Sequence, residues 1–188
     1  MENDTTPNPI AATQNRITRI SKAMALLCLL LMGLLPPGLA LYWLMASPAD
    51  LGFHAWLPAQ AIAQPLLAWQ RGLGLGVTLL PLLMLLRGVW MARKCFLLFA
   101  QGDVFSTQTI RYLRLFAAWM AASIVARIAV GTALSVLLTW HNPPGMRQLA
   151  ISFGSTELFS LFFAGMVWLM AAVIGQAQAL AEENASFV

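Results

Sequence analysis

The chain has 188 residues, of which 60% are hydrophobic and 10% are charged, and its mean hydropathy is +0.74. A soluble domain carries about a quarter charged residues, so the composition excludes an ordinary water-soluble protein. Eleven Lys and Arg against seven Asp and Glu give a net charge of +4. The basic residues stand near the ends of apolar stretches instead of on a soluble basic face, so they do not indicate direct nucleic-acid binding.

Four apolar stretches are each long enough to cross a bilayer, which takes about 20 helical residues. They cover approximately residues 23–46, 72–91, 113–138 and 158–176. The sequence therefore predicts an all-α membrane protein, a polytopic bundle of four transmembrane helices with the lipid bilayer as its solvent. We expect one domain over residues 1–188, with a disordered tail at 1–20 and a second tail at 177–188.

The first stretch follows Arg16, Arg19 and Lys22 and has the alternative reading of a signal peptide. Apolar character resumes at Leu39 and the total is too long for a cleaved signal, so we predict an uncleaved signal anchor. Within it, Pro36-Pro37-Gly38 favours a kinked helix. The alternative is a broken helix that forms a binding site, as in some transporters.

The orientation follows from the basic residues near the span ends, because cytoplasmic loops are enriched in Lys and Arg. One side holds Arg16, Arg19, Lys22, Arg87, Arg93, Lys94, Arg111 and Arg114. The other side holds Arg71 and Arg147. This asymmetry predicts that both termini are cytoplasmic and that residues 47–71 and 140–154 lie outside.

Arg127 stands near the middle of the third stretch, where a charged side chain is costly and is expected to have a partner. Ser123, Arg127, Gly131 and Ser135 recur every four residues and so share one helix face. Two interpretations of Arg127 stay open. It is either a structural residue buried between helices or part of a ligand or ion site.

Glu157, close to the outer end of the fourth stretch, is the only nearby carboxylate that could pair with Arg127. Counting at 1.5 Å per residue from Trp140 and from Ser155 separates the two side chains in depth by roughly 16 Å, which disfavours a salt bridge. Pro36, Pro37 and Pro81 leave backbone carbonyl groups without a helical donor. We therefore expect Arg127 to bond to the freed carbonyl groups, those of Met32, Gly33 and Val77.

Residue types that carry catalysis or bind metals are sparse. Cys28 and Cys95 match no metal-binding spacing, and His54 and His141 lie in different loops. The glycines of the segment 72–76 follow no predicted strand, which argues against a dinucleotide-binding loop, but Gly72 and Gly76 are spaced for close helix packing. We expect no catalytic residues, no cofactor and no metal, and hence no enzyme.

The connection between the second and third stretches is predicted to form a cytoplasmic helical hairpin over residues 92–112. Gly102 is expected at the C′ position that ends its first helix. Ser106 or Thr107 is expected to cap the second helix, with Phe105 wedged at the corner.

This connection carries a family resemblance. Its residues Leu97-Leu98-Phe99, Gly102-Asp103-Val104-Phe105-Ser106, Ile110 and Leu113-Arg114 resemble the signature of the bacterial membrane proteins grouped as domain of unknown function 2975. The closing residues 181–188 are also similar to that family. The resemblance implies a multi-pass protein of the bacterial inner membrane with no established catalytic residues. Because family members are often encoded beside small helix-turn-helix transcription regulators, it also implies such a regulator as a partner.

Glu182 and Glu183 lie near a helix C-terminus, where the helix dipole disfavours acids. The tail either docks on the basic residues of the hairpin or stays solvated. The leading functional prediction is a non-enzymatic regulatory or sensing protein that presents its cytoplasmic hairpin and tail to a partner. The alternative is a small homo-oligomeric transporter or channel component, with Arg127, Ser123 and Ser135 along its path.

Overall fold

A computed structural model describes residues 9–185 except 59–60, 63–66, 144 and 152. The helices in this part of the chain are α1 (Pro9–Met45), α2 (Pro48–His54), α3 (Ala68–Ala100), α4 (Thr107–Thr139) and α5 (Ser155–Ala185). Four of them hold segments long and apolar enough to cross a membrane, namely Gln14–Met45, Ala68–Ala100, Thr107–Thr139 and Ser155–Leu180. The predicted all-α membrane fold with four spans is confirmed.

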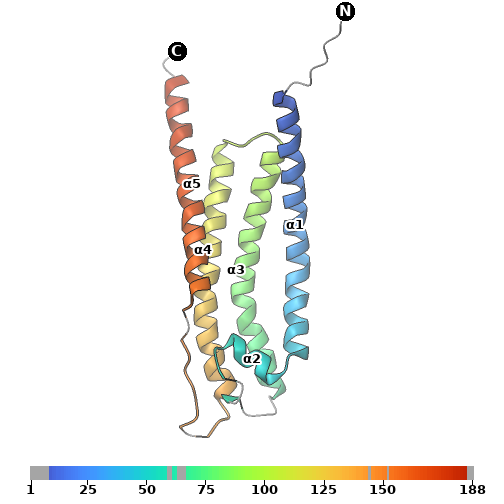
Figure 1. The fold of residues 1–188 in the computed structure, drawn as a ribbon, viewed down its shortest axis with the longest axis vertical. Coiled ribbons are helices and arrows are strands. Elements are labelled where there is room, and N and C mark those ends of the chain that lie inside the picture. Colours follow the sequence, from blue (N-terminus) through green and yellow to red (C-terminus); the bar gives the residue numbers. More distant parts are fainter. Residues whose placement is uncertain (1–8, 59–60, 63–66, 144, 152, 186–188) are drawn as a thin grey trace, which may run out of the picture.

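The four long helices lie side by side, and each packs mainly on its neighbour in the chain: α1 on α3, α3 on α4, and α4 on α5. Figure 1 shows the first turns of α1 and the last turns of α5 at the same end of the molecule as the connection between α3 and α4. We call this the hairpin end. The short helix α2 lies at the opposite end, which we call the α2 end.

Helix α1 begins earlier than the sequence predicts. Residues 9–20 are helical, so the prediction of a disordered tail over residues 1–20 is wrong from Pro9 onward, while residues 1–8 lie outside the described part. Proline is favoured in the first turn of a helix, and the segment is anchored at the hairpin end, where the Thr18 hydroxyl donates to the carbonyl oxygen of Ala100 at 3.5 Å. Helix α1 also continues through Pro36 and Pro37, which excludes a broken helix there.

Helix α2 was not predicted, although the sequence holds a signal for it. The backbone N–H of Ser47 donates to the Asp50 carboxylate at 3.0 Å, and the N–H of Asp50 donates to the Ser47 hydroxyl at 3.3 Å. This reciprocal capping precedes Pro48 at the first helical position. Helix α2 contributes Leu51 to a buried apolar cluster, which consists of Trp43, Ala46, Leu51, Ala55, Leu57, Ile62, Val130, Leu134 and Leu138. The α2 end therefore has a packed core of its own.

Between α4 and α5 the chain doubles back in an extended form. We call residues 146–151 the return segment, and Figure 1 shows it running beside α4 from the α2 end to the start of α5. Two hydroxyl groups of α4 hold its backbone: Gln148 N–H donates to Thr139 Oγ1 at 3.3 Å, and Ala150 N–H donates to Ser135 Oγ at 3.0 Å. Helix α5 consequently begins partway along α4 instead of level with its end.

Candidate functional site

Arg127 forms an ion pair with Glu157, the first-turn acid of α5. The expectation that these two side chains lie too far apart in depth is wrong. The sequence estimate placed the start of α5 level with the end of α4, whereas the return segment is extended and advances about 3.3 Å per residue. That advance brings Glu157 to the level of Arg127.

The expected bonds from Arg127 to proline-freed carbonyl groups are also wrong, because its partner among the described residues is Glu157. A different arginine binds carbonyl groups of α1. Arg71 Nη1 donates to the carbonyl oxygens of Trp43 at 2.9 Å and Leu44 at 3.1 Å. These groups belong to the last turn of α1, where the helix has unpaired carbonyls and a cation is favoured. Arg71 thus joins the C-terminus of α1 to the first turn of α3.

The side chains of the predicted polar stripe on α4 have separate roles. Ser135 is fully buried, and its hydroxyl accepts from the return segment while donating to the carbonyl oxygen of Thr132 at 2.7 Å. Ser123 is buried and donates to the carbonyl oxygen of Met120 at 2.7 Å. The Glu157 side chain is only 4% exposed and also accepts from Gly154 N–H at 3.0 Å, but that of Arg127 is 52% exposed. Ser135 and Arg127 therefore contact the chain that follows α4, whereas Ser123 bonds within α4.

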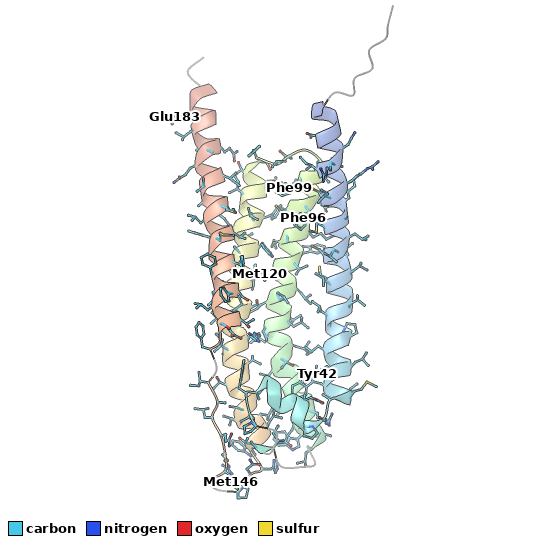
Figure 2. The ribbon with its side chains drawn as sticks, viewed as in Figure 1. Tyr42, Phe96, Phe99, Met120, Met146 and Glu183 are labelled. Atoms are coloured by element: carbon cyan, nitrogen blue, oxygen red, sulfur yellow. The ribbon has the colours of Figure 1, made fainter. Side chains whose placement is uncertain are left out.

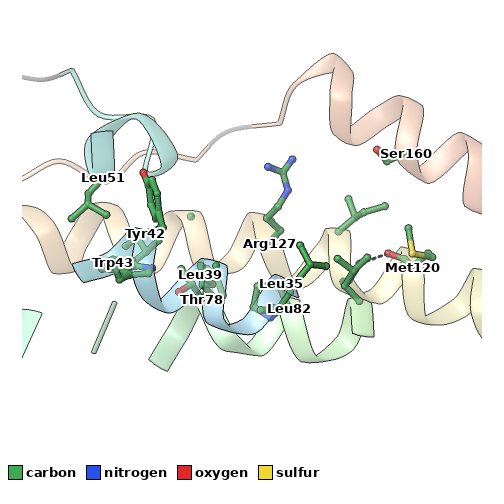
Figure 3. Close-up of a pocket in the computed structure, with 18 of the residues that line it drawn as sticks. Leu35, Leu39, Tyr42, Trp43, Leu51, Thr78, Leu82, Met120, Arg127 and Ser160 are labelled. Carbon is green, nitrogen blue, oxygen red and sulfur yellow. Dashed lines mark hydrogen bonds between the residues drawn. The ribbon is translucent and has the colours of Figure 1, made fainter. Parts of the chain in front are cut away.

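A cavity of about 640 Å³ lies between α1, α3 and α4. Its volume falls within the range typical of small-molecule sites. Figure 3 shows Leu35, Leu39 and Leu82 on its walls, with the Arg127 side chain extending away from the α4 ribbon. The full lining consists of Leu34, Leu35, Gly38, Leu39, Tyr42, Trp43, Leu51, Thr78, Pro81, Leu82, Leu85, Met120, Ser123, Ile124, Arg127, Val130, Gly131, Leu134 and Ser160. Sequence reasoning singled out Ser123, Arg127 and Gly131 on one face of α4, and also Gly38 and Pro81. It did not predict a cavity, because most of the walls are ordinary apolar residues.

Most polar groups on the cavity wall are bonded to nearby backbone. Thr78 donates to the carbonyl oxygen of Gly74 at 2.8 Å, Ser160 to that of Thr156 at 2.7 Å, and Tyr42 to that of Asp50 at 3.0 Å. Ser123 bonds within its own helix in the same way. Arg127 is the charged residue of this lining, and its charge is paired with Glu157.

One cavity wall depends on a glycine that the sequence reasoning passed over. The ring of Trp43 packs on the backbone of Gly74, where an added Cβ atom would overlap it. Gly72 and Gly76, the pair predicted to pack closely, have nothing within 4 Å of an added Cβ atom. The close approach of α1 and α3 therefore occurs at Gly74, and the prediction for Gly72 and Gly76 is wrong.

The hairpin between α3 and α4 follows the predicted local chemistry. Gly102 has a φ of +87°. Its N–H donates to the carbonyl oxygen of Phe99, and the N–H of Asp103 donates to the carbonyl oxygen of Leu98. This is the pattern of a Schellman motif. Ser106 caps α4 by accepting from Thr109 N–H at 3.3 Å. Phe105 is 71% exposed, so the expectation that it is wedged at the corner is wrong.

The tail continues α5 alongside the hairpin. Gln178 donates to the hydroxyl of Thr107 at 3.0 Å, which joins α5 to the first residue of α4. Beyond this contact Glu183 is exposed, as Figure 2 shows near the end of α5. The side chain of Glu182 lies outside the described residues, so its predicted contact with the basic residues of the hairpin stays a prediction.

The candidate residues therefore gather in two places. Arg127, Ser123 and the cavity form one, and Gly102, Asp103, Phe105 and Ser106 at the hairpin end form the other. Ser106 and Arg127 lie 21 residues apart on the same helix, which corresponds to roughly 31 Å. In the described part of the chain no group of three His, Cys, Asp or Glu residues could hold a metal ion, and Cys28 and Cys95 are free and buried.

Comparison with known protein families assigns the chain to one of them. The model of the family described as "Protein of unknown function (DUF2975)" matches residues 56–188, which include α3, α4, α5 and the hairpin. No curated protein and no solved structure matches the chain. The match covers well over half of the sequence and includes the hairpin residues that carried the resemblance, so the chain belongs to the DUF2975 family of proteins of unknown function.

Proposed function

We propose that the protein is a non-enzymatic regulatory or sensing protein of the bacterial inner membrane that presents its hairpin to a cytoplasmic partner. The observation that carries the proposal is that the Phe105 side chain is 71% exposed. It lies at the tip of a hairpin whose other residues are held by hydrogen bonds. A large aromatic side chain on a rigid turn is the kind of residue that anchors protein interfaces. The positive charge near this end supports a cytoplasmic location.

Two local structures hold Phe105 in place. The Schellman motif at Gly102 ends α3 on one side, and the Ser106 cap begins α4 on the other. The Thr109 hydroxyl adds a bond to the carbonyl oxygen of Asp103 at 2.9 Å. Because the loop is held at both ends, a partner would not need to order it on binding, which lowers the cost of association. By family analogy we propose a small helix-turn-helix transcription regulator as the partner.

The proposal is tested by placing a photo-crosslinking amino acid at Phe105 in intact cells. Met146 is the matched control, because it is 63% exposed but lies at the α2 end. We expect Phe105, and not Met146, to crosslink a helix-turn-helix regulator, and we expect the purified regulator to lose binding to a Phe105→Ser variant. Equal crosslinking at both positions, or unchanged binding to the variant, would contradict the proposal.

A second candidate is a homo-oligomeric transporter or channel component, and the observation that favours it is Arg127 on the wall of a cavity within the spans. Its path would contain Arg127 and Ser123. Ser135 would lie off that path, because it is fully buried under the return segment. Solute flux into vesicles that contain the protein, lost in an Arg127→Gln variant, would favour this candidate over the first.

A further inference from the structure

We infer that the cavity binds a membrane phospholipid, with the headgroup phosphate bonded to Arg127 and an acyl chain between α1, α3 and α4. Arg127 lies midway along the α4 lining, which runs from Met120 to Leu134. The part on the hairpin side, from Arg127 to Met120, is seven residues or roughly 10 Å of helix, and it takes the part of the acyl chain next to the headgroup. Five of the ten lining residues from α1 and α3 are leucines, and such an apolar surface solvates an alkyl chain and rejects polar solutes.

Arg127 supplies the recognition of the headgroup. A guanidinium carries several N–H donors and has no acceptor. Its partner among the described residues is Glu157, and half of its side chain is exposed. One oxygen of the Glu157 carboxylate faces Arg127 and the other accepts from Gly154 N–H at 3.0 Å. The N–H donors of Arg127 that do not face Glu157 are open to an acceptor from outside the chain, and a phosphate matches the guanidinium geometry.

The depth of Arg127 agrees with a phosphate. The apolar part of α5 after Glu157 runs over residues 158–175, about 18 residues or ~27 Å. This length nearly equals the hydrocarbon core of a bilayer, about 30 Å. If α5 spans that core, Glu157 and Arg127 lie at its edge, where phosphates of one leaflet lie. The deeper lining residues Leu85, Met120 and Ser123 then extend from that edge toward the bilayer centre.

A lipid would enter from the side. Helix α1 packs on α3, and α5 packs on α4, so the main helix contacts do not close the face between α1 and α5. Helix α5 contributes Ser160 to the lining. At the α2 end the cavity meets Tyr42, Trp43 and Leu51. We therefore assign the α2 end to the headgroup side and the hairpin end to the side toward which the chain points.

The experiment uses the full-length protein, stripped of lipid in mild detergent and titrated with phosphatidylglycerol or with diacylglycerol of the same chains. Bound lipid is counted by native mass spectrometry. We expect phosphatidylglycerol to bind at least about tenfold more tightly than diacylglycerol, because only the former offers charge-assisted hydrogen bonds to Arg127. Equal binding of the two lipids would overturn the assignment of the phosphate to Arg127.

Two variants test the headgroup contact and the acyl-chain contact separately. Arg127→Gln is expected to lose the preference for phosphatidylglycerol. Gly38→Phe is expected to abolish binding of both lipids, because Gly38 lines the cavity, where an added Cβ atom has nothing within 4 Å and the larger side chain takes up space at the cavity wall. Gly33→Phe is the matched control: it lies on the same helix, is equally open, and does not line the cavity. Unchanged binding to Gly38→Phe, or equal losses in both glycine variants, would overturn the proposed site.

Discussion

The indole ring of Trp43 packs on the backbone of Gly74, so that α1 and α3 meet at a point where no side chain fits between them. Trp43 is only 3% exposed and belongs to both the buried cluster at the α2 end and the cavity wall. One contact therefore joins the packing of the α2 end to the shape of the cavity. Its strength can be measured directly.

Gly74→Ala should lower the stability of the protein by about 1–3 kcal/mol, because the new methyl group overlaps the buried ring of Trp43, which must shift to accommodate it. The measurement is thermal unfolding in detergent. Gly76→Ala is the control on the same helix, with nothing within 4 Å of its added Cβ atom. It should leave stability unchanged or raise it by a fraction of about 1 kcal/mol, as alanine favours helix. Equal destabilisation by both changes would contradict the packing at Gly74.

The ion pair of Arg127 and Glu157 predicts a double-mutant cycle. Arg127→Leu leaves the buried Glu157 carboxylate without a counter-ion, which should cost about 3 kcal/mol. Adding Glu157→Leu removes the stranded charge, so the double variant should recover part of this loss. The cycle is measured by chemical or thermal unfolding. Strictly additive effects of the two substitutions would show that the two side chains do not interact.

The hairpin predicts a local effect at Gly102. Its φ of +87° is disfavoured for residues with a Cβ atom, so Gly102→Ala should cost about 1–2 kcal/mol. The effect should appear as faster hydrogen exchange of the Gly102 and Asp103 amides, which bond to α3. Gly33→Ala, in the open middle of α1, should leave these amides unchanged. Slow exchange in the Gly102 variant would count against the Schellman motif.

The orientation can be tested with cysteine labelling, because both native cysteines are buried. Arg147→Cys, in the exposed return segment, should react with a membrane-impermeant maleimide added outside intact cells. Gln101→Cys, exposed at the hairpin end, should react only after the membrane is opened. The reverse pattern would place the hairpin outside and remove the basis for a cytoplasmic partner.

Much of the fold could be predicted because hydropathy and local capping are read directly from the sequence. The four spans follow from apolar length, and Gly102 and Ser106 have the predicted roles because a Schellman glycine and an N-cap depend on residues close in the chain. The start of α1 at Pro9 was missed because a polar, proline-containing segment was expected to remain unpacked. In the structure its Thr18 hydroxyl reaches the end of α3.

The candidate site was harder to predict, because it depends on contacts between distant segments. The ion pair of Arg127 with Glu157 requires knowing that the chain after α4 is extended, which no residue type specifies. The cavity is lined by leucines that also suit lipid contact, so composition did not mark them. Gly74 differs from Gly72 and Gly76 only in what faces it, which is the ring of Trp43.

The length of the return segment also fixes where α5 begins along α4. A residue in extended chain advances more than twice as far as a residue in a helix, so each residue added to or removed from the return segment changes the position of α5 along the bundle by about 3 Å. The number of residues in the return segment therefore decides which residue of α4 the Glu157 carboxylate faces. An insertion would move the negative charge away from Arg127 while leaving every transmembrane residue unaltered.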